Sequence, residues 1–143
     1  IAVYLLTDKD GKLVQPSAAP APLPQAVAPK PGTPMSAGRL AYMMSCAGCH
    51  GINGEGIPNV SPALKGNATL AMDNPQTLIK AILNGIPTQI FTGGQRMYAM
   101  PPFAHRMSDA EVADLVNWIR AEWGGQAVPV TAEQVSAQET VVK

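Results

Sequence analysis

The sequence predicts an all-α fold, and three observations support this prediction. Apolar residues recur at helical spacing in three stretches, 36–46, 74–85 and 108–124, and each stretch begins with a residue that caps helices. Loops rich in glycine and proline separate these stretches. No convincing pattern of parallel strands lies between them. We therefore expect helices packed around one small core.

The N-terminal part differs in composition from the rest. Residues 1–14 begin with a short apolar run that ends at an Asp-Gly turn signal; the run fits either a strand on the core or the remnant of a preceding domain. Residues 15–34 hold half of the chain's 14 prolines, interleaved mainly with alanine. This composition predicts an extended, semi-rigid linker. One folded domain is expected over 35–125, followed by a C-terminal extension with a short helix over 126–143.

The first helix is expected to begin after Ser36, a capping residue, and to run toward Cys46. Gly38, Tyr42 and Cys46 recur at intervals of four, which places them on nearly the same helical face. A glycine on that face permits close approach by another helix.

A short motif follows this helix. Cys46 and Cys49 are three positions apart, and His50 comes directly after the second thiol. This Cys-x-x-Cys-His pattern is the attachment signature of a c-type haem. The spacing lets both sulfurs reach one edge of a porphyrin, and the histidine then supplies an axial ligand to the iron. The motif predicts one covalently bound haem c.

Two other interpretations of the cysteine pair compete with haem attachment. A closed zinc site needs four nitrogen or sulfur ligands, and beyond the motif the chain offers only His105. A dithiol redox pair usually lies near a βαβ pattern, which the sequence does not show. The histidine that directly follows the second cysteine favours haem.

The remaining helices have clear start signals. Asn74-Pro75 resembles a cap followed by proline at the first helical position, and Gly85 stands where a left-handed C-terminal residue is wanted. Ser108 and Glu111 form a Ser-x-x-Glu capping box, which predicts the clearest helix of the chain, ending at 124–125. A similar Thr-x-x-Gln pattern at Thr131 predicts a short C-terminal helix.

The sixth iron ligand decides between an electron carrier and a haem that binds ligands or substrates. Met100 is the favoured candidate, because it lies in a loop stiffened by two prolines just before the last long helix. Met97 shares this loop and is the second choice. Met107 lies too close to a helix cap to reach the iron easily, and His105 fits a surface position better than a ligand.

An axial histidine needs its other ring nitrogen held, and a backbone carbonyl normally does this. Pro62 is the candidate for His50, because proline has no N–H to spend on secondary structure and its loop follows closely after the motif. The alternative is that Pro62 only shapes the loop.

Composition limits the classes of function. A formal net charge of zero at pH 7 gives no excess of basic residues that would indicate nucleic-acid binding. It also favours docking of redox partners through apolar side chains around the exposed haem edge over long-range electrostatic steering. Both cysteines are used by the motif, so no disulfide is expected. No apolar run approaches the about 18 residues of a membrane-spanning helix. Covalent haem attachment implies an extracytoplasmic compartment, the periplasm in a bacterium.

Several of these features together resemble a class I, mono-haem c-type cytochrome domain. They are the haem motif, Gly38 and Tyr42 ahead of it, Met100-Pro-Pro-Phe103 and the terminal helix with Trp118. The resemblance implies that the first and last helices cross through Gly38, Tyr42 and Trp118. It implies an all-α fold around one covalent haem c, preceded here by the proline-rich segment.

The resemblance also assigns the haem pocket. Cys46 and Cys49 would hold the haem covalently, with His50 and Met100 as axial ligands. The remaining pocket residues would be Pro62, Leu64, Tyr42 and Phe103.

A narrower resemblance is to the third, C-terminal haem domain of the tri-haem cytochrome subunit of membrane-associated quinoprotein alcohol dehydrogenases. The segments that carry it are 61–67, 99–103, 107–112, 123–124 and 130–135. This resemblance implies that residues 1–14 are the end of a second haem domain and that the chain is a fragment of a longer protein.

The predicted function is one-electron transfer, without substrate chemistry in this chain. The donor would be a quinoprotein dehydrogenase or a neighbouring haem domain, and the acceptor a quinone, a soluble cytochrome or a terminal oxidase, at the periplasmic face of the inner membrane. Two alternatives remain: a free-standing mono-haem cytochrome, and a haem enzyme or sensor with an open sixth site.

Overall fold

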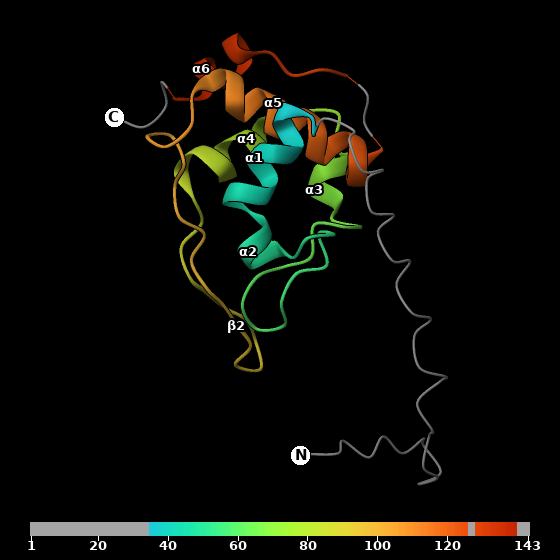
Figure 1. Cartoon of the computed structure of the whole chain (residues 1–143). Coiled ribbons are helices and arrows are strands. Elements are labelled where there is room, and N and C mark those ends of the chain that lie inside the picture. The colour runs from blue at the N-terminus through green and yellow to red at the C-terminus, as the bar shows by residue number, and fades with distance from the viewer. Residues whose placement is uncertain (1–34, 126–127, 140–143) are drawn as a thin grey trace, which may run out of the picture. The chain divides into compact units, whose positions relative to one another are not determined.

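The computed structural model of the chain describes residues 35–125 and 128–139 (Figure 1). The expected domain remnant at 1–14 and the expected linker at 15–34 lie outside the described residues. Within the described part, helices predominate and the prediction of a helical fold is confirmed. No helix there is long and apolar enough to cross a membrane.

Helix α1 spans Ala37–Ser45 and begins where the sequence predicts. The Ser36 side chain accepts a hydrogen bond from the Arg39 N–H at 3.3 Å, which satisfies one of the free donors of the first turn. After one residue the chain continues as α2, Ala47–His50, so the haem motif forms a short helical turn.

Helices α3 and α4 follow the first loop. Helix α3 spans Ala68–Ala71 and α4 spans Gln76–Asn84. The Asn74 side chain accepts a hydrogen bond from the Gln76 N–H at 3.0 Å, but the cap position of α4 is held by Pro75, one residue later than predicted. Gly85 ends this helix with a φ of 71°, which an L side chain rarely adopts.

Helix α5, Asp109–Ile119, has the predicted capping box. The Ser108 side chain accepts from the Glu111 N–H, and the Glu111 carboxylate accepts from the Ser108 N–H at 2.8 Å. The helix passes into a π-helical turn, η1, at Arg120–Gly124, and the chain leaves it at Gly125 in the left-handed conformation. The sequence pattern predicts the helix and its end but not the widened turn.

The predicted C-terminal helix is present as α6, Ala132–Glu139. Thr131 and Gln134 exchange hydrogen bonds between backbone N–H groups and side chains, at 2.9 and 3.4 Å. Val130 and Val135 are buried against the core, where α6 packs on α5 and α4.

Arg120 lies in the core and is 2% exposed. Its guanidinium donates hydrogen bonds to the backbone carbonyls of Met72 and Asp73, at 2.9 and 3.2 Å, and of Val128, at 3.1 Å. The side chain therefore joins the segment after α3 to the segment before α6.

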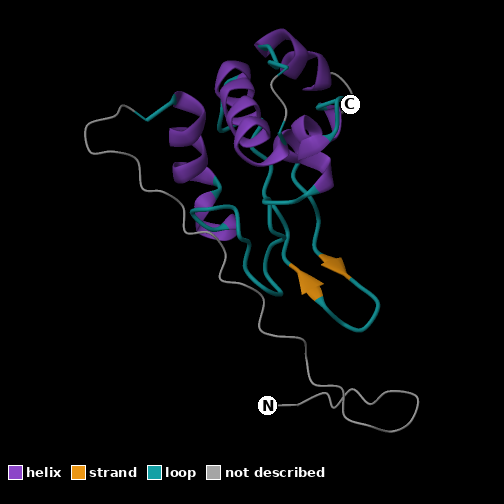
Figure 2. Cartoon of the chain, turned by 90° about the vertical axis from the view of Figure 1, so that its right-hand side faces the viewer, coloured by secondary structure: helices purple, strands orange, loops and turns teal. Residues whose placement is uncertain are grey.

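A two-stranded antiparallel hairpin replaces part of the expected loop before α5 (Figure 2). Strand β1 is Gln89–Ile90 and β2 is Arg96–Met97, with Gln89 opposite Met97. Two glycines with positive φ, at 93 and 94, make its turn. Each strand has two residues, too few for an alternating pattern to be recognised in the sequence.

The core is organised by the contact of α1 with α5 (Figure 1). A methyl group at Gly38 would collide with the backbone oxygen of Asp114 and with the Cβ of Trp118. The two helices therefore approach as closely as they do because position 38 has no side chain. Tyr42 lies one turn further along α1, with its ring 5.1 Å from that of Trp118 between centroids.

Candidate functional site: an apolar slot beside the Cys-x-x-Cys-His turn

A cavity of about 320 Å³ opens between the α1–α2 turn, residues 60–62 and residues 86–103. A second hollow of about 170 Å³ lies on the side of α3 and α4. Both spaces are lined by the same five residues, which are Cys46, His50, Pro62, Ile86 and Met100. Because these residues bound both spaces, the two hollows adjoin and form what we call the central slot.

The two cysteines line the slot as free thiols, Cys46 buried and Cys49 exposed. Burial raises the pKa of the Cys46 thiol to about 11, and the neighbouring Cys49 adds to this effect. A redox-active pair needs a thiol whose pKa is lowered, so that the thiolate is available. The environment of Cys46 has the opposite effect, so Cys46 is not the activated thiol of such a pair.

The zinc interpretation also lacks support. Within residues 35–125 and 128–139, no group of three or more histidine, cysteine or acidic side chains is placed to hold a metal ion. A closed zinc site requires four such ligands.

The imidazole of His50 is held by the predicted carbonyl. Its Nδ1 lies 3.0 Å from the backbone oxygen of Pro62. Since a carbonyl only accepts, Nδ1 carries the proton, and Nε2 is left with a free lone pair for a metal.

Three further hydrogen bonds hold the backbone around His50. The Ser61 hydroxyl donates to the Cys49 carbonyl, and the Gly56 N–H donates to the His50 carbonyl at 2.8 Å. The Tyr42 hydroxyl donates to the Gly51 carbonyl at 2.5 Å. The carbonyls of three successive residues, 49, 50 and 51, thus each accept a hydrogen bond. We call these three hydrogen bonds the frame of His50, because they hold the backbone that carries the imidazole.

The roles of Ser61 and Tyr42 in this frame were not predicted. Ser61 directly precedes Pro62, the predicted partner of His50. A hydroxyl at that position is the sequence signal that could have predicted a hydrogen bond from Ser61. Burial raises the pKa of the Tyr42 phenol, and the nearby Cys46 and Glu55 add to this effect. The phenol therefore stays protonated and available as a donor.

Met100 is positioned by a pair of backbone hydrogen bonds. The Ile86 N–H donates to the Met100 carbonyl at 3.0 Å, and the Met100 N–H donates to the Ile86 carbonyl at 2.8 Å. A Cβ at Gly85 would collide with the Met100 carbonyl and would lie 2.9 Å from the carbonyl carbon of Pro101. The absence of a side chain at position 85 therefore lets this segment lie against the end of α4.

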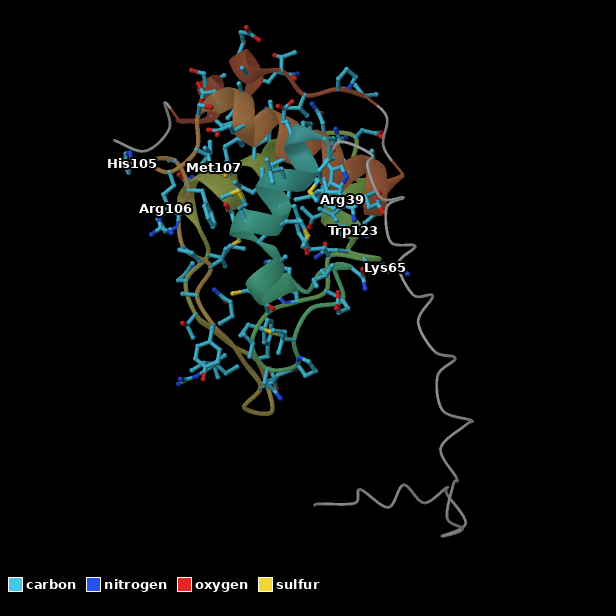
Figure 3. All side chains as sticks on the ribbon, viewed as in Figure 1. Arg39, Lys65, His105, Arg106, Met107 and Trp123 are labelled. Atoms are coloured by element: carbon cyan, nitrogen blue, oxygen red, sulfur yellow. The ribbon has the colours of Figure 1, made fainter. Side chains whose placement is uncertain are left out.

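The other candidate ligands are placed less favourably. Met97 lines the larger cavity but not the smaller one. Met107 packs against the core and lines neither. His105 is exposed, lines neither space and points away from the body of the domain (Figure 3). Of these four residues, Met100 alone shares both spaces with His50.

The remaining predicted pocket residues separate into two groups. Phe103 is 7% exposed and lines the larger cavity, and Leu64 lines the smaller one. Tyr42 lines neither space; it is fully buried between Trp118 and Trp123. Its connection to the slot is the hydrogen bond to the backbone next to His50.

Over residues 35–123 the sequence matches the family described as Cytochrome c. The chain belongs to the cytochrome c family. The cofactor of this family is a covalently bound haem c, and its function is electron transfer. The walls of the central slot are largely apolar and carry two thiols, an imidazole and a thioether. This set of donors suits haem c.

Curated relatives include cytochrome subunits of dehydrogenases. The cytochrome c subunit of alcohol dehydrogenase (quinone) from Gluconacetobacter polyoxogenes is 34% identical over 100 residues, or 69% of this chain and 21% of that subunit. The gluconate 2-dehydrogenase cytochrome c subunit of Pantoea cypripedii is 33% identical over 108 residues, or 74% of this chain and 24% of that subunit. The chain thus spans about a fifth to a quarter of the length of these relatives, and the resemblance to such subunits is confirmed.

A smaller relative is matched over most of its length. Cytochrome c-552 of Thermus thermophilus is 35% identical over 98 residues, which are 63% of this chain and 75% of that protein.

Charge is distributed unevenly over the described part of this cytochrome domain. Residues 35–107, which form nearly all of the slot, carry Arg39, Lys65, Lys80, Arg96 and Arg106 against Glu55 and Asp73. Residues 108–138 carry Asp109, Glu111, Asp114, Glu122 and Glu133 against the buried Arg120. A net charge of zero therefore conceals a C-terminal segment with an excess of acidic residues and a preceding segment with an excess of basic residues.

Proposed function

We propose that this domain transfers single electrons through a haem c that is held covalently by Cys46 and Cys49, with His50 and Met100 as axial ligands. The observation that carries the proposal is that His50 and Met100 both line the two adjoining hollows of the central slot. When bound, the haem supplies the one-electron step, because its iron is stable in both the ferric and the ferrous state.

The chain's own residues have distinct parts in this function. The Cys46 and Cys49 sulfurs form the thioether links, and His50 binds through Nε2 while Pro62 keeps Nδ1 protonated. The Met100 thioether favours the ferrous state and raises the potential. The apolar walls at Leu64, Phe103 and Ile86 exclude water, which has the same effect on the potential.

We further propose that the domain works in a chain of redox centres at the periplasmic face of the inner membrane. The dehydrogenase cytochrome subunits among its relatives support a dehydrogenase or a neighbouring haem domain as donor. A quinone, a soluble cytochrome or a terminal oxidase would then accept the electron. Oxidation of the substrate would belong to another chain, and this domain would not be an enzyme.

Spectroscopy of the haem-loaded protein tests the ligand set. Histidine and methionine ligation gives a low-spin spectrum, with the weak near-infrared band of sulfur-to-iron charge transfer. A high-spin ferric spectrum and ready binding of carbon monoxide by the ferrous protein would contradict this assignment. That result would support a haem enzyme or sensor with an open sixth site.

A second function is favoured by the match to cytochrome c-552, which covers three quarters of that protein. In this case the domain would be a free-standing mono-haem carrier. The intact mass and haem content of the native polypeptide in its source cells distinguish the two. A large multi-haem polypeptide supports the dehydrogenase subunit, and a mono-haem polypeptide close in size to this chain supports the free carrier.

A further inference from the structure

Arg120 is the one charged residue that is buried in the part of the chain that the structure describes. An arginine side chain keeps its charge in proteins. Removing a charge from water is costly, and an apolar side chain of similar volume often serves the stability of a fold equally well. The burial of a cation at this position therefore indicates a role besides packing.

The guanidinium is held by uncharged groups. It donates hydrogen bonds to the backbone carbonyls of Met72, Asp73 and Val128, and its Nε is buried without a hydrogen-bond partner among the described residues. Carbonyl dipoles orient toward a cation but do not cancel its charge. Asp73 offers its carbonyl here and is itself an exposed residue, so water screens its carboxylate. A positive charge therefore stays in the interior.

The segments around this guanidinium also form part of the wall of the smaller hollow. Ile119, the residue before Arg120, lines this hollow, and so does Leu70, which lies two residues before the first anchoring carbonyl. The turn η1 packs against α3, where a methyl group at Gly124 would collide with the Leu70 carbonyl (Figure 1). Both proposed axial ligands line the same hollow. Arg120 lines neither hollow, so its charge acts there through space.

The acidic side chains near Arg120 in the chain differ from it in exposure. Asp114 and Glu122 are both exposed, whereas Arg120 is 2% exposed. Water and salt screen the charges of exposed groups, and they screen a buried charge much less. We therefore expect the buried cation to outweigh these surface carboxylates in the electrostatic potential at the slot.

We propose that Arg120 tunes the haem, raising its reduction potential through the field of a buried positive charge. The inference rests on the proposed function, because it requires a redox-active haem in the slot. Ferric iron carries one more positive charge than ferrous iron, so a fixed cation nearby disfavours the ferric state. The reducing electron comes from the donor of the proposed function. Arg120 makes no bond to the iron and keeps its own protons throughout.

Equilibrium potentials of haem-loaded variants test this role. Arg120→Met removes the charge and keeps a long side chain, and Arg120→Lys replaces the fixed charge by one that can titrate. We expect the equilibrium constant for reduction by a reference couple to fall several-fold in Arg120→Met. In Arg120→Lys it should match the parent protein at about pH 5 and fall below it as the buried lysine loses its proton at higher pH.

Ionic strength separates the buried charge from the surface charges. Glu122→Gln is the matched control, because Glu122 lies in the same turn as Arg120 and is exposed. Its small effect should have the opposite sign at low salt and should vanish at about 1 M salt, where the Debye length is about 3 Å. The effect of Arg120→Met should persist at that salt concentration.

Equal equilibrium constants in Arg120→Met and the parent protein would overturn the proposal. An equal fall in Arg120→Met and Arg120→Lys at about pH 5 would overturn it as well, because a loss common to both variants follows from disturbed packing. If Arg120→Met does not fold, the pH series of Arg120→Lys decides alone. A curve parallel to that of the parent protein from about pH 5 to about pH 10 then contradicts the proposal, because a buried lysine loses its proton within this range.

The near-infrared band reports the ligands of the iron separately. Its absence from the parent protein would contradict the proposed ligation by His50 and Met100. An intact band together with an unchanged potential in Arg120→Met would contradict only the tuning role. A failure of the proposed function and a failure of this inference are therefore distinguishable.

Discussion

The two sides of the central slot are built in different ways. The histidine wall, residues 46–64, is held by hydrogen bonds to the carbonyls of Cys49, His50 and Gly51 and by the contact of the imidazole with Pro62. The methionine wall, residues 85–103, is a hairpin that closes on itself through the Ile86–Met100 pair.

The methionine wall carries several exposed apolar side chains. On the methionine wall, Ile90 is 67% exposed, Tyr98 59% and Phe91 50%, and Phe91 and Tyr98 line the slot. One backbone hydrogen bond, from the Tyr98 N–H to the Val60 carbonyl at 2.9 Å, links this wall to the loop opposite. The methionine wall is therefore held mainly by its own backbone pairing, and it presents exposed apolar side chains to the slot.

The largest expected effect concerns the ligand on the methionine wall. Met100→Ala should abolish the near-infrared band, open the sixth site to carbon monoxide and lower the potential by ~0.1 V, within the about 0.8 V that axial ligands span. Met97→Ala is the matched control, since Met97 lines only the larger cavity. Retention of the band in Met100→Ala and its loss in Met97→Ala would reverse the assignment.

The next effect concerns the attachment of the methionine wall to α4. Gly85→Ala should lower the free energy of unfolding by at least about 2 kcal/mol, because it combines backbone strain with a collision at the Met100 carbonyl. Denaturant midpoints measure the loss. Gly93→Ala is the control, because Gly93 also has a positive φ, of 96°, but has open space around it. Equal losses in both variants would show that the close approach of the Met100 carbonyl to Gly85 does not contribute to stability.

A smaller effect is expected on the histidine wall. Ser61→Ala removes one of several hydrogen bonds around His50 and should cost about 1 kcal/mol of stability. The low-spin spectrum should persist, because Pro62 still holds the imidazole. Ser61→Thr, which keeps the hydroxyl, should lie between this variant and the parent protein. A spectrum in Ser61→Ala that indicates loss of the histidine would mean that this wall is less redundant than its contacts indicate.

The smallest effect is expected far from both walls. Hydrogen bonds from the Ser108 N–H and hydroxyl hold the pKa of Glu111 below its ordinary value of 4.5. Because the folded pKa is the lower one, the stabilisation is complete above the unfolded pKa and is lost as the pH falls through the folded pKa. Glu111→Gln keeps the cap but cannot titrate.

This variant should therefore unfold at a slightly lower temperature than the parent protein at pH 7, and the difference should shrink from about pH 5 to about pH 3. The haem spectrum should not change. An altered near-infrared band would mean that α5 influences the slot more strongly than its contacts indicate.

The contrast between the walls also explains what the sequence could predict. The histidine wall follows from a motif of fixed spacing and from a proline that has no N–H, and both are local signals. The capping boxes at Ser108 and Thr131 are local too. The hydrogen bond from Ser61 to the Cys49 carbonyl joins positions twelve apart, and no pattern within a short window encodes it.

The methionine wall was predicted only in part. Met100 could be selected because prolines follow it, but the pairing of Ile86 with Met100 depends on a turn between two strands of two residues each. The π-helical turn was also missed. No local pattern in the sequence marks this turn at Arg120–Gly124.

Arg120 has a consequence for how this module can be moved between proteins. The family match ends at residue 123, yet the guanidinium is anchored on the carbonyl of Val128, and Val130 and Val135 complete the core beyond that. A chimaera cut at the end of the family match would leave a cation in the interior with one anchor missing and the core open on one side. Grafting this redox unit onto another scaffold therefore requires the chain at least to Val135.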